Sequence, residues 1–266
     1  MASPNRVLIT GATSGLGREM AVQLGAQGHR VAITGRRKEK LEETARAVAA
    51  AGGECLPLLG GVTDLDEVKR HYAEISAKWG GLDWAILNAG VGDSVNAREF
   101  KAENYHWTFA TNIGGVANWL EAVIPGMLAA KSGTIAGVAS LAAFRGLPRS
   151  GAYSASKAAL VTMLESVRVD LRGTGVSVVT ICPGFVKSEM TDRNDPKDMM
   201  FLLEVKDGAA RMLRGIAAKK RIVHFPWQLS YPAIYLLHNL PGFLYDAIAG
   251  KIKRRKKPYQ DPSRQG

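Results

Sequence analysis

Cysteine is scarce in this sequence, with only Cys55 and Cys182 among 266 residues. Two cysteines cannot form the multi-bridge framework that stabilises small secreted domains. Both lie in apolar, strand-like runs, so we interpret them as buried thiols of a reducing compartment. The first strand-like run begins at Arg6, and no signal-peptide pattern precedes it. We therefore expect a cytoplasmic protein.

The sequence also lacks internal repeats and low-complexity linkers. Its 266 residues can bury a sizeable core, and its content of 46% apolar and 22% charged residues is ordinary for a globular chain. We expect a catalytic domain at residues 1–224, which includes a lid at about 185–204. An apolar segment and a basic tail follow at 225–266. No metal site is expected.

Acidic residues are too few to balance the basic ones, and the net charge is +11. Residues 251–266 contain seven basic residues and one acid, a net charge of +6, so the rest of the chain is only mildly basic. The apolar residues beside this tail favour a membrane surface over DNA as its partner. We expect no nucleic-acid partner. A nucleic-acid arm is the alternative, which binding with a steep salt dependence would reveal.

Residues 222–245 contain no Asp, Glu, Lys or Arg. Such a length could span a bilayer, but three prolines interrupt it: Pro226, Pro232 and Pro241. Pro241 predicts the first turn of a final helix, whose apolar stripe consists of Leu244, Ile248 and Ile252. An apolar stripe beside a basic cluster is typical of an interfacial anchor, and predicts peripheral association with the inner face of a membrane. Equally, these residues could cover the substrate pocket or a subunit interface.

Strand and helix patterns alternate along the chain, which predicts a parallel sheet covered by helices. Apolar runs predict strands at 6–10, 30–34, 54–59, 82–87, 133–138, 175–181 and 221–224. Residues 102–128 have a helical pattern that is interrupted at 111–115, where an asparagine comes shortly before two glycines. The expected fold class is α/β, with a doubly wound, mostly parallel, Rossmann-like sheet flanked by helices.

Three glycines follow the first predicted strand: Gly11, Gly15 and Gly17. Glycines between a strand and a helix let the backbone approach a phosphate, which the helix N-terminus then stabilises. Their spacing is G-x-x-x-G-x-G, which differs from the usual G-x-G-x-x-G. Tight packing of the strand on the helix is the alternative explanation.

The second predicted strand ends without an acidic residue. An NAD-binding fold commonly places a carboxylate there, where it accepts a hydrogen bond from the ribose 2′-OH. Here Gly35 is followed by Arg36 and Arg37. An arginine can bind a 2′-phosphate through charge-assisted hydrogen bonds. We therefore expect NADP(H) as cofactor, with a solvated helix terminus as the alternative.

Tyr153 and Lys157 are four residues apart in a helix of small residues, so they project from one face. A phenol is a weak proton donor because its ordinary pKa is about 10. A cation one turn away stabilises the phenolate and lowers that pKa. The spacing therefore indicates a proton-transfer pair, although a surface lysine beside a packed tyrosine would give the same pattern.

From residue 6 to about 223, the sequence resembles the short-chain dehydrogenase/reductase superfamily. The resemblance rests on motifs in that family's order: Thr10-Gly-x-x-x-Gly-x-Gly17, Asn88-Ala-Gly90, Asn112, Ser140, Tyr153-x-x-x-Lys157 and Pro183-Gly184. It implies that Tyr153 exchanges a proton with the substrate oxygen and that Ser140 positions this oxygen. It also implies that Lys157 lowers the pKa of Tyr153 and binds the nicotinamide ribose, and that Asn112 holds a proton-relay water.

The resemblance further implies a set of cofactor-binding residues: Gly11, Thr13, Ser14, Gly15, Leu16, Gly17, Arg36, Asn88, Ala89, Gly90, Tyr153, Lys157, Pro183, Gly184, Val186 and Ser188. A homo-oligomer, either a dimer or a tetramer, is expected as well. The chain departs from the family at Gly60-Gly61-Val62, where Asp-Val is common near the adenine, so that contact is expected to be weaker or water-filled. Leu87 stands where a second asparagine is frequent. Ser14 replaces a basic residue of some NADP-dependent relatives, which leaves more of the 2′-phosphate recognition to Arg36.

These residues predict an NADP(H)-dependent oxidoreductase that acts on a ketone, an aldehyde or a secondary alcohol. The alternative is a catalytically silent NADP(H)-binding sensor or membrane-surface scaffold, against which the complete set of four catalytic residues argues. The lid contributes several large apolar side chains: Phe185, Met190, Met199, Met200, Phe201, Leu202 and Leu203. They favour a hydrophobic or lipid-like substrate, although packing of the lid itself would need the same residues.

Overall fold

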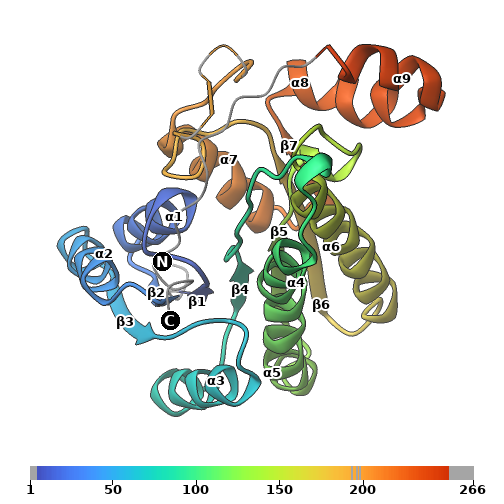
Figure 1. Cartoon of the computed structure of the whole chain (residues 1–266). Coiled ribbons are helices and arrows are strands. Elements are labelled where there is room, and N and C mark those ends of the chain that lie inside the picture. The colour runs from blue at the N-terminus through green and yellow to red at the C-terminus, as the bar shows by residue number, and fades with distance from the viewer. Residues whose placement is uncertain (1–4, 193, 196, 198, 252–266) are drawn as a thin grey trace.

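The computed structural model describes residues 5–192, 194–195, 197 and 199–251. Within these residues, seven strands pair in parallel into one sheet with the order β3-β2-β1-β4-β5-β6-β7 (Figure 1). The strands are β1 (Arg6–Ile9), β2 (Arg30–Gly35), β3 (Glu54–Leu59), β4 (Trp84–Leu87), β5 (Gly133–Val138), β6 (Val176–Pro183) and β7 (Ile222–Phe225). The doubly wound parallel sheet expected from the sequence is confirmed.

The strand order reverses direction at β1. β1 pairs with β2 on one side, where Leu8 is opposite Ala32, and with β4 on the other, where Leu8 is opposite Ala85. The chain therefore winds outward from β1 to β3, returns to β4, and winds outward again to β7. In such sheets, ligands bind beyond the carboxyl ends of the strands at this point of reversal.

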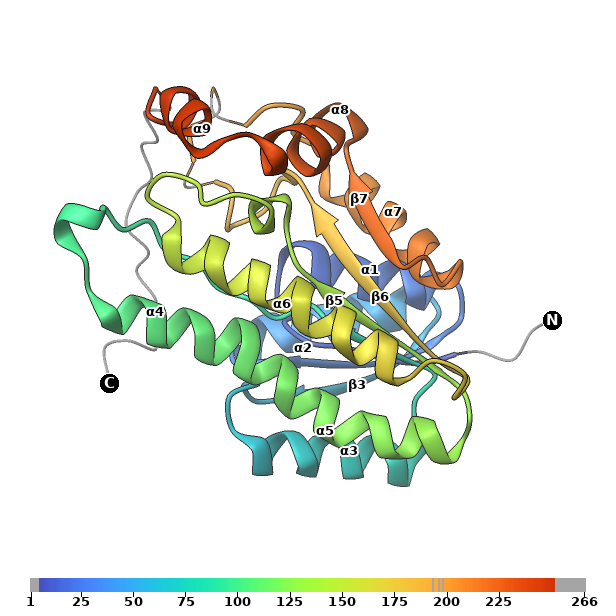
Figure 2. The same cartoon turned by 90° about the vertical axis from the view of Figure 1, so that its right-hand side faces the viewer.

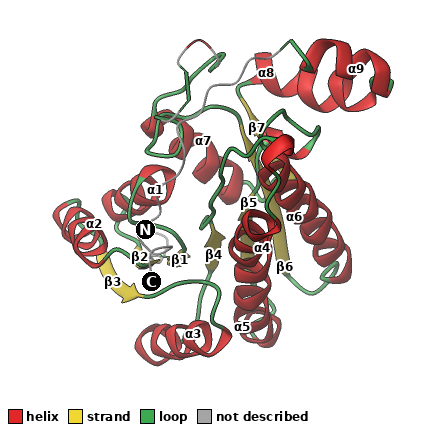
Figure 3. Cartoon of the chain, viewed as in Figure 1, coloured by secondary structure: helices red, strands yellow, loops and turns green. Residues whose placement is uncertain are grey.

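Helices cover both faces of the sheet (Figures 2 and 3). α1 (Gly15–Ala26) packs against both α2 (Lys38–Ala50) and α7 (Val205–Ala217) on one face. The other face carries α3 (Leu65–Trp79), α4 (Ala102–Phe109), α5 (Gly115–Ala129) and α6 (Gly151–Asp170). Successive strand side chains point to opposite faces, so Val7 and Ile9 join one core and Leu8 joins the other. All three are fully buried, as expected for a parallel sheet covered on both sides.

Between α4 and α5, a π-helical turn (Ala110–Gly114, labelled η2) joins the two helices. It confirms the interruption that the sequence predicts at 111–115. Asn112 lies in this turn and is fully buried. The turn thus brings a polar side chain of a helix into the interior, at the carboxyl end of the sheet.

The C-terminal part of the described chain lies beyond the carboxyl end of β6 (Figure 2). It contains α8 (Trp227–Tyr231), a π-helical turn η5 (Pro232–Leu236), a 3-10 turn η6 (Leu237–Asn239) and α9 (Gly242–Ala249). Pro241 is the N-cap of α9, one position before its expected place in the first turn. Ile252 of the predicted apolar stripe and the basic residues after it lie outside the described residues. No helix in the described ranges has the length and apolar character needed to cross a membrane.

Candidate active site

The loop between β1 and α1 lies against the end of β4. Gly11 and Gly15 have φ angles of +67° and +54°, which favour glycine. A Cβ on Gly11 would be only 2.8 Å from the Cα of Ala89, and one on Gly17 would overlap the carbonyl of Gly11. Side chains at these positions would therefore push the loop away from β4.

Asn88 holds this loop in place. Its Nδ2 donates hydrogen bonds to the carbonyls of Thr10 and Gly11, at 3.0 and 3.2 Å. In return, the Thr10 hydroxyl accepts hydrogen bonds from the backbone N–H groups of Asn88 and Ala89, both at 3.0 Å. Thr10 is a positioning residue that the sequence analysis did not include among the site residues. The sequence feature that could have indicated this role is the position of a hydroxyl residue between an apolar run and the first glycine.

The residues of this loop fit the pyrophosphate of a dinucleotide. No side chain caps the N-terminus of α1, and its first turn contains no acidic residue. Its first N–H groups can therefore meet an anion without competition from a carboxylate. The expected cofactor residues Gly15, Leu16 and Gly17 form this first turn.

Two arginines flank the end of β2, and the one that contacts the glycine loop is not the one emphasised by the sequence analysis. Arg37 donates to the Thr13 hydroxyl from both Nε and Nη2, at 3.2 and 3.0 Å, and to the Ser14 hydroxyl at 2.8 Å. The Arg36 side chain instead runs past Gly61, where its Cδ lies 3.9 Å from the position of an added Cβ. Arg37 thus reaches the loop after β1 while Arg36 reaches the loop after β3, so the pair brackets the expected ribose position.

Ser140 and Tyr153 meet beyond the end of β5. Ser140 is the N-cap of a short 3-10 helix, η3 (Leu141–Ala143), where its hydroxyl accepts a hydrogen bond from the N–H of Ala142 at 3.1 Å. Tyr153 lies in the first turn of α6 and is half-buried. Burial raises the pKa of Tyr153 above its ordinary value, and a hydrogen bond with the Ser140 side chain partly opposes that rise.

Lys157 lies deeper, one turn along α6, and is only 3% exposed. Its Nζ donates a hydrogen bond to the carbonyl of Val138 at 2.7 Å and lies 5.8 Å from the centre of the Tyr153 ring. Burial lowers the pKa of Lys157 to about 8. Burial of the phenol is the largest influence on the pKa of Tyr153 in this structure. The expected lowering of that pKa by Lys157 stays a prediction.

The Asn112 side chain joins the loop after β4 to α6 through hydrogen bonds. Its side chain accepts from the N–H of Val91 at 2.8 Å and donates to the Val91 carbonyl and to Ser156 Oγ, both at 2.9 Å. Ser156 in turn donates to the carbonyl of Tyr153 at 2.8 Å. Both amide protons of Asn112 thus form hydrogen bonds that hold α6 beside the loop after β4. Its role in holding a water stays a prediction.

The first residues of the predicted lid, from about residue 185, lie close to the glycine loop. Gly184 donates its N–H to the carbonyl of Phe225 at 2.7 Å, which fixes the Pro183-Gly184 turn to β7. Val186 is buried, and Ser188 lies so close to α1 that a Cβ on Gly15 would be 3.3 Å from its Cβ. The hydroxyl of Thr191, a residue that the sequence analysis did not single out, accepts a hydrogen bond from the N–H of Ser188 at 2.8 Å.

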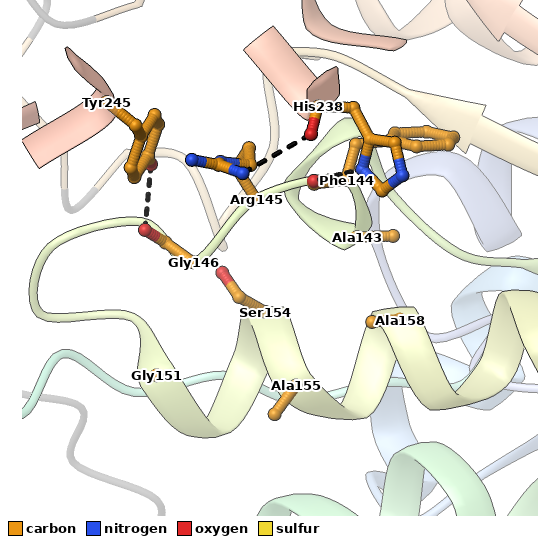
Figure 4. A pocket seen from close by; sticks show the side chains of 10 residues that line it. All are labelled: Ala143, Phe144, Arg145, Gly146, Gly151, Ser154, Ala155, Ala158, His238 and Tyr245. Atoms are coloured by element: carbon orange, nitrogen blue, oxygen red, sulfur yellow. Dashed lines mark hydrogen bonds between the residues drawn. The ribbon is translucent and has the colours of Figure 1, made fainter. Parts of the chain in front are cut away.

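Two cavities open beside these residues. One, of about 290 Å³, lies between the loop after β4 and the start of α6, with Asp93, Phe100 and Leu147 in its wall. The other, of about 480 Å³, lies between the loop after η3 and the C-terminal segment (Figure 4).

Hydrogen bonds and a cation–π contact join the C-terminal segment to the loop that follows Ser140 (Figure 4). The guanidinium carbon of Arg145 lies 4.1 Å from the centre of the Tyr245 ring, and Arg145 also donates to the carbonyl of His238 at 3.3 Å. The Tyr245 hydroxyl donates to the Gly146 carbonyl at 2.8 Å. His238 Nδ1 donates to the carbonyl of Phe144 at 2.7 Å. His238 and Tyr245 therefore line the cavity of about 480 Å³ beside the loop that follows Ser140.

Known proteins resemble the chain over most of its length. An uncharacterized oxidoreductase from Myxococcus xanthus is 45% identical over 246 residues, which cover 92% of this chain and 96% of that protein. The 3-oxoacyl-[acyl-carrier-protein] reductase FabG of Staphylococcus aureus is 33% identical over 193 residues, or 72% of this chain and 78% of the reductase.

Solved structures agree with the fold. Levodione reductase superposes with a TM-score of 0.78 at 25% identity, covering 87% of this chain and 99% of that one. A short chain dehydrogenase/reductase from Burkholderia phymatum, in complex with NAD, gives a TM-score of 0.81 at 25% identity, covering 97% of this chain and 98% of that one. The short chain dehydrogenase family matches residues 5–198, which include Asn112, Ser140, Tyr153 and Lys157. The chain therefore belongs to the short chain dehydrogenase family and is an oxidoreductase of that family.

Proposed function

We propose that this oxidoreductase uses NADP(H) to reduce a ketone or aldehyde, or to oxidise the corresponding alcohol. The observation that carries the proposal is the convergence of Ser140, Tyr153 and Lys157 at the carboxyl end of β5. A catalytically silent dinucleotide-binding scaffold would not need a buried lysine beneath a tyrosine that is hydrogen-bonded to a serine. Burying an ionisable lysine costs stability, which a catalytic role explains.

In this mechanism, Tyr153 donates a proton to the substrate oxygen while Ser140 holds that oxygen by a hydrogen bond. When bound, the nicotinamide ring supplies the hydride. The raised pKa of Tyr153 keeps the phenol protonated at neutral pH, which suits a proton donor in the reducing direction. With a pKa of about 8, Lys157 is mostly charged at neutral pH and stabilises the phenolate that the transfer leaves behind.

The preference for NADP(H) is supported by Arg36 and Arg37, which follow β2 where an NAD-binding fold commonly has an acidic residue. Arg37 also forms an ion pair with Glu189 at 2.8 Å, so a bound 2′-phosphate would compete with that carboxylate for the guanidinium group. Ser14, which Arg37 contacts, adds a hydroxyl donor on the glycine-loop side. The NAD in the Burkholderia phymatum complex belongs to that protein.

A hydrophobic or lipid-like substrate is supported by the lid. Met200, Phe201 and Leu202 are exposed, so packing within the lid does not account for them. Further exposed aromatic residues lie on the C-terminal segment, which supports peripheral association with the inner face of a membrane. On this proposal, residues 1–224 form the catalytic part and 225–266 the surface that meets lipid. A homo-oligomer, dimer or tetramer, is proposed from the family.

The test is a panel of apolar ketones and aldehydes, followed by NADPH oxidation at 340 nm, with wild type and Tyr153→Phe compared. Loss of the general acid should reduce the rate about 10²–10⁴-fold, while calorimetry should show unchanged NADPH binding. A Tyr153→Phe rate above about a tenth of wild type would overturn this mechanism.

A further inference from the structure

A polar cluster at the end of β3 has no part in the proposed proton transfer. Gly60 and Gly61 follow β3, and two side chains of α3, Glu67 and His71, reach back to them. Glu67 Oε2 accepts a hydrogen bond from the N–H of Gly61 at 2.8 Å. A Cβ built on Gly60 would lie 2.6 Å from Cδ of Glu67 and 2.6 Å from Cε1 of His71. The carboxylate and the imidazole therefore fill the space that a side chain at position 60 would occupy.

The charge of Glu67 is not neutralised by this neighbour. His71 is 9% exposed, and burial lowers the pKa of its ring although the carboxylates of Glu67 and Glu74 raise it. The imidazole is therefore neutral at neutral pH. The ion pairs found in the described part of the chain do not include Glu67.

The Glu67 side chain keeps an acceptor atom available. Gly61 bonds to Oε2 of Glu67, which leaves Oε1 for another donor. His71 interacts with the backbone of Leu59, and its Nδ1 is buried without a hydrogen-bond partner among the described residues. A buried polar atom without a partner is costly, so a polar group of a ligand beside Glu67 would improve this cluster.

The sheet indicates which part of a dinucleotide faces the cluster. In doubly wound sheets, the pyrophosphate lies at the helix after β1 and the adenosine ribose at the end of β2. β3 pairs with β2 on the side away from β1, and the N–H of Gly60 donates to the carbonyl of Gly35 at 3.1 Å. The group next to that ribose, further out along the sheet, is the base.

We propose that Glu67 recognises the adenine base by accepting a hydrogen bond from its 6-amino group. This inference rests on the proposed use of a nicotinamide adenine dinucleotide. A carboxylate only accepts, so it favours a 6-amino base and repels a 6-oxo base, whose oxygen also only accepts. The carboxylate absent from Gly60-Gly61 is thus supplied by α3, and the adenine contact is stronger than the sequence alone leads one to expect.

A purely structural role for Glu67 predicts a different result. Glu67 is the third residue of α3, and its N–H donates to the capping carboxylate of Asp64 at 3.0 Å. In that role Glu67 would only fix the conformation of the loop through Gly61, and its loss would weaken the binding of every dinucleotide equally. The two roles therefore differ in their dependence on the 6-amino group.

The experiment measures binding of NADP⁺ and of its 6-oxo analogue, nicotinamide hypoxanthine dinucleotide phosphate, by calorimetry with the full chain. Wild type should bind NADP⁺ about tenfold more tightly than the analogue. In Glu67→Gln, the amide oxygen can still accept from Gly61 while its NH₂ favours a 6-oxo base, so the preference should vanish or reverse. Glu74→Gln, an equal charge change on the exposed face of α3, should keep it.

Equal affinity of wild type for both dinucleotides, or an unchanged ratio in Glu67→Gln, would overturn the assignment. If Glu67→Gln fails to fold, Glu67→Asp retracts the carboxylate without removing its charge and should also reduce the ratio. Failure of wild type to bind either dinucleotide would instead overturn the proposed function.

Discussion

Lys157 is the residue whose ionisation sets the upper pH limit of the proposed reaction. Its pKa of about 8 means that it loses its proton as the pH rises through 8, whereas the raised pKa of Tyr153 keeps the phenol protonated there. We expect kcat/KM for carbonyl reduction to fall above pH 8, by up to about tenfold per pH unit. A pH-rate profile measures this decline. Lys157→Met should show a low rate without that decline, and an identical profile in both proteins would contradict the assignment.

Arg37 is expected to carry at least as much of the NADP(H) preference as Arg36. Arg37→Ala should lower the ratio of kcat/KM for NADPH over NADH by about tenfold to a hundredfold, because one charge-assisted hydrogen bond to a phosphate is lost. Arg36→Ala tests the neighbouring position. Lys38→Ala is the matched control, since Lys38 is an exposed cation at the start of α2. Equal kcat/KM for the two cofactors in the wild type would exclude the preference altogether.

At this scale, the sequence identifies residue types better than residue contacts. Tyr153, Lys157 and Ser140 could be found because their motif has a fixed spacing. The contact of Arg37 with Ser14 could not be found in this way. The sequence does not show which of two adjacent arginines faces the glycine loop, because this depends on the path of the chain after β2. The shift of the Tyr153 pKa could not be foreseen either, because it depends on burial from several elements.

Among the elements, the loop after Ser140 and the C-terminal segment act together. Tyr245→Phe removes the hydrogen bond to Gly146 but leaves a ring for Arg145 to stack on. We propose that the cavity between this loop and the C-terminal segment admits the carbonyl substrate. Loss of one such bond should then loosen the wall of the cavity and raise KM for that substrate about two- to tenfold. Dinucleotide affinity, measured separately by calorimetry, should not change. An equal effect on both would show that the contact serves general stability.

The strands and helices themselves could largely be predicted from periodicity. β3 and β5 have the predicted limits: β3 ends before Gly60 and β5 begins at Gly133. α1 begins at Gly15, inside the glycine motif, and this start is not visible in the sequence because glycines do not contribute to helical periodicity. β6 extends to Pro183 since its partner β7 continues to Phe225, a tertiary pairing that local sequence does not encode.

For the whole molecule, the distribution of exposed apolar side chains predicts membrane association. The C-terminal segment presents Trp227 at 65% and Phe243 at 73% exposure, and the sequence after residue 250 carries a net charge of +6. We expect the protein to co-sediment with anionic vesicles at moderate salt and Trp227→Ser/Phe243→Ser to do so at least about tenfold less.

The matched control is Val169→Ser, which removes an apolar side chain that is also largely exposed, at 58%, near the far end of α6. It should bind vesicles as wild type does. Wild-type protein that remains in the supernatant would leave the alternative, in which the same residues cover a pocket or a subunit interface.

The tie between Thr10 and Asn88 joins positions 78 residues apart, and the hold of Tyr245 on Gly146 joins positions 99 apart. Contacts of such separation form late, because a long loop must first be closed. During synthesis the chain emerges from its N-terminus. The glycine loop can therefore reach its final position once β4 has left the ribosome, while the cavity beside Gly146 is completed only by the final helix. A nascent chain of this protein would contain all of its proposed cofactor-binding residues, the last of which is Ser188, before that helix is synthesised.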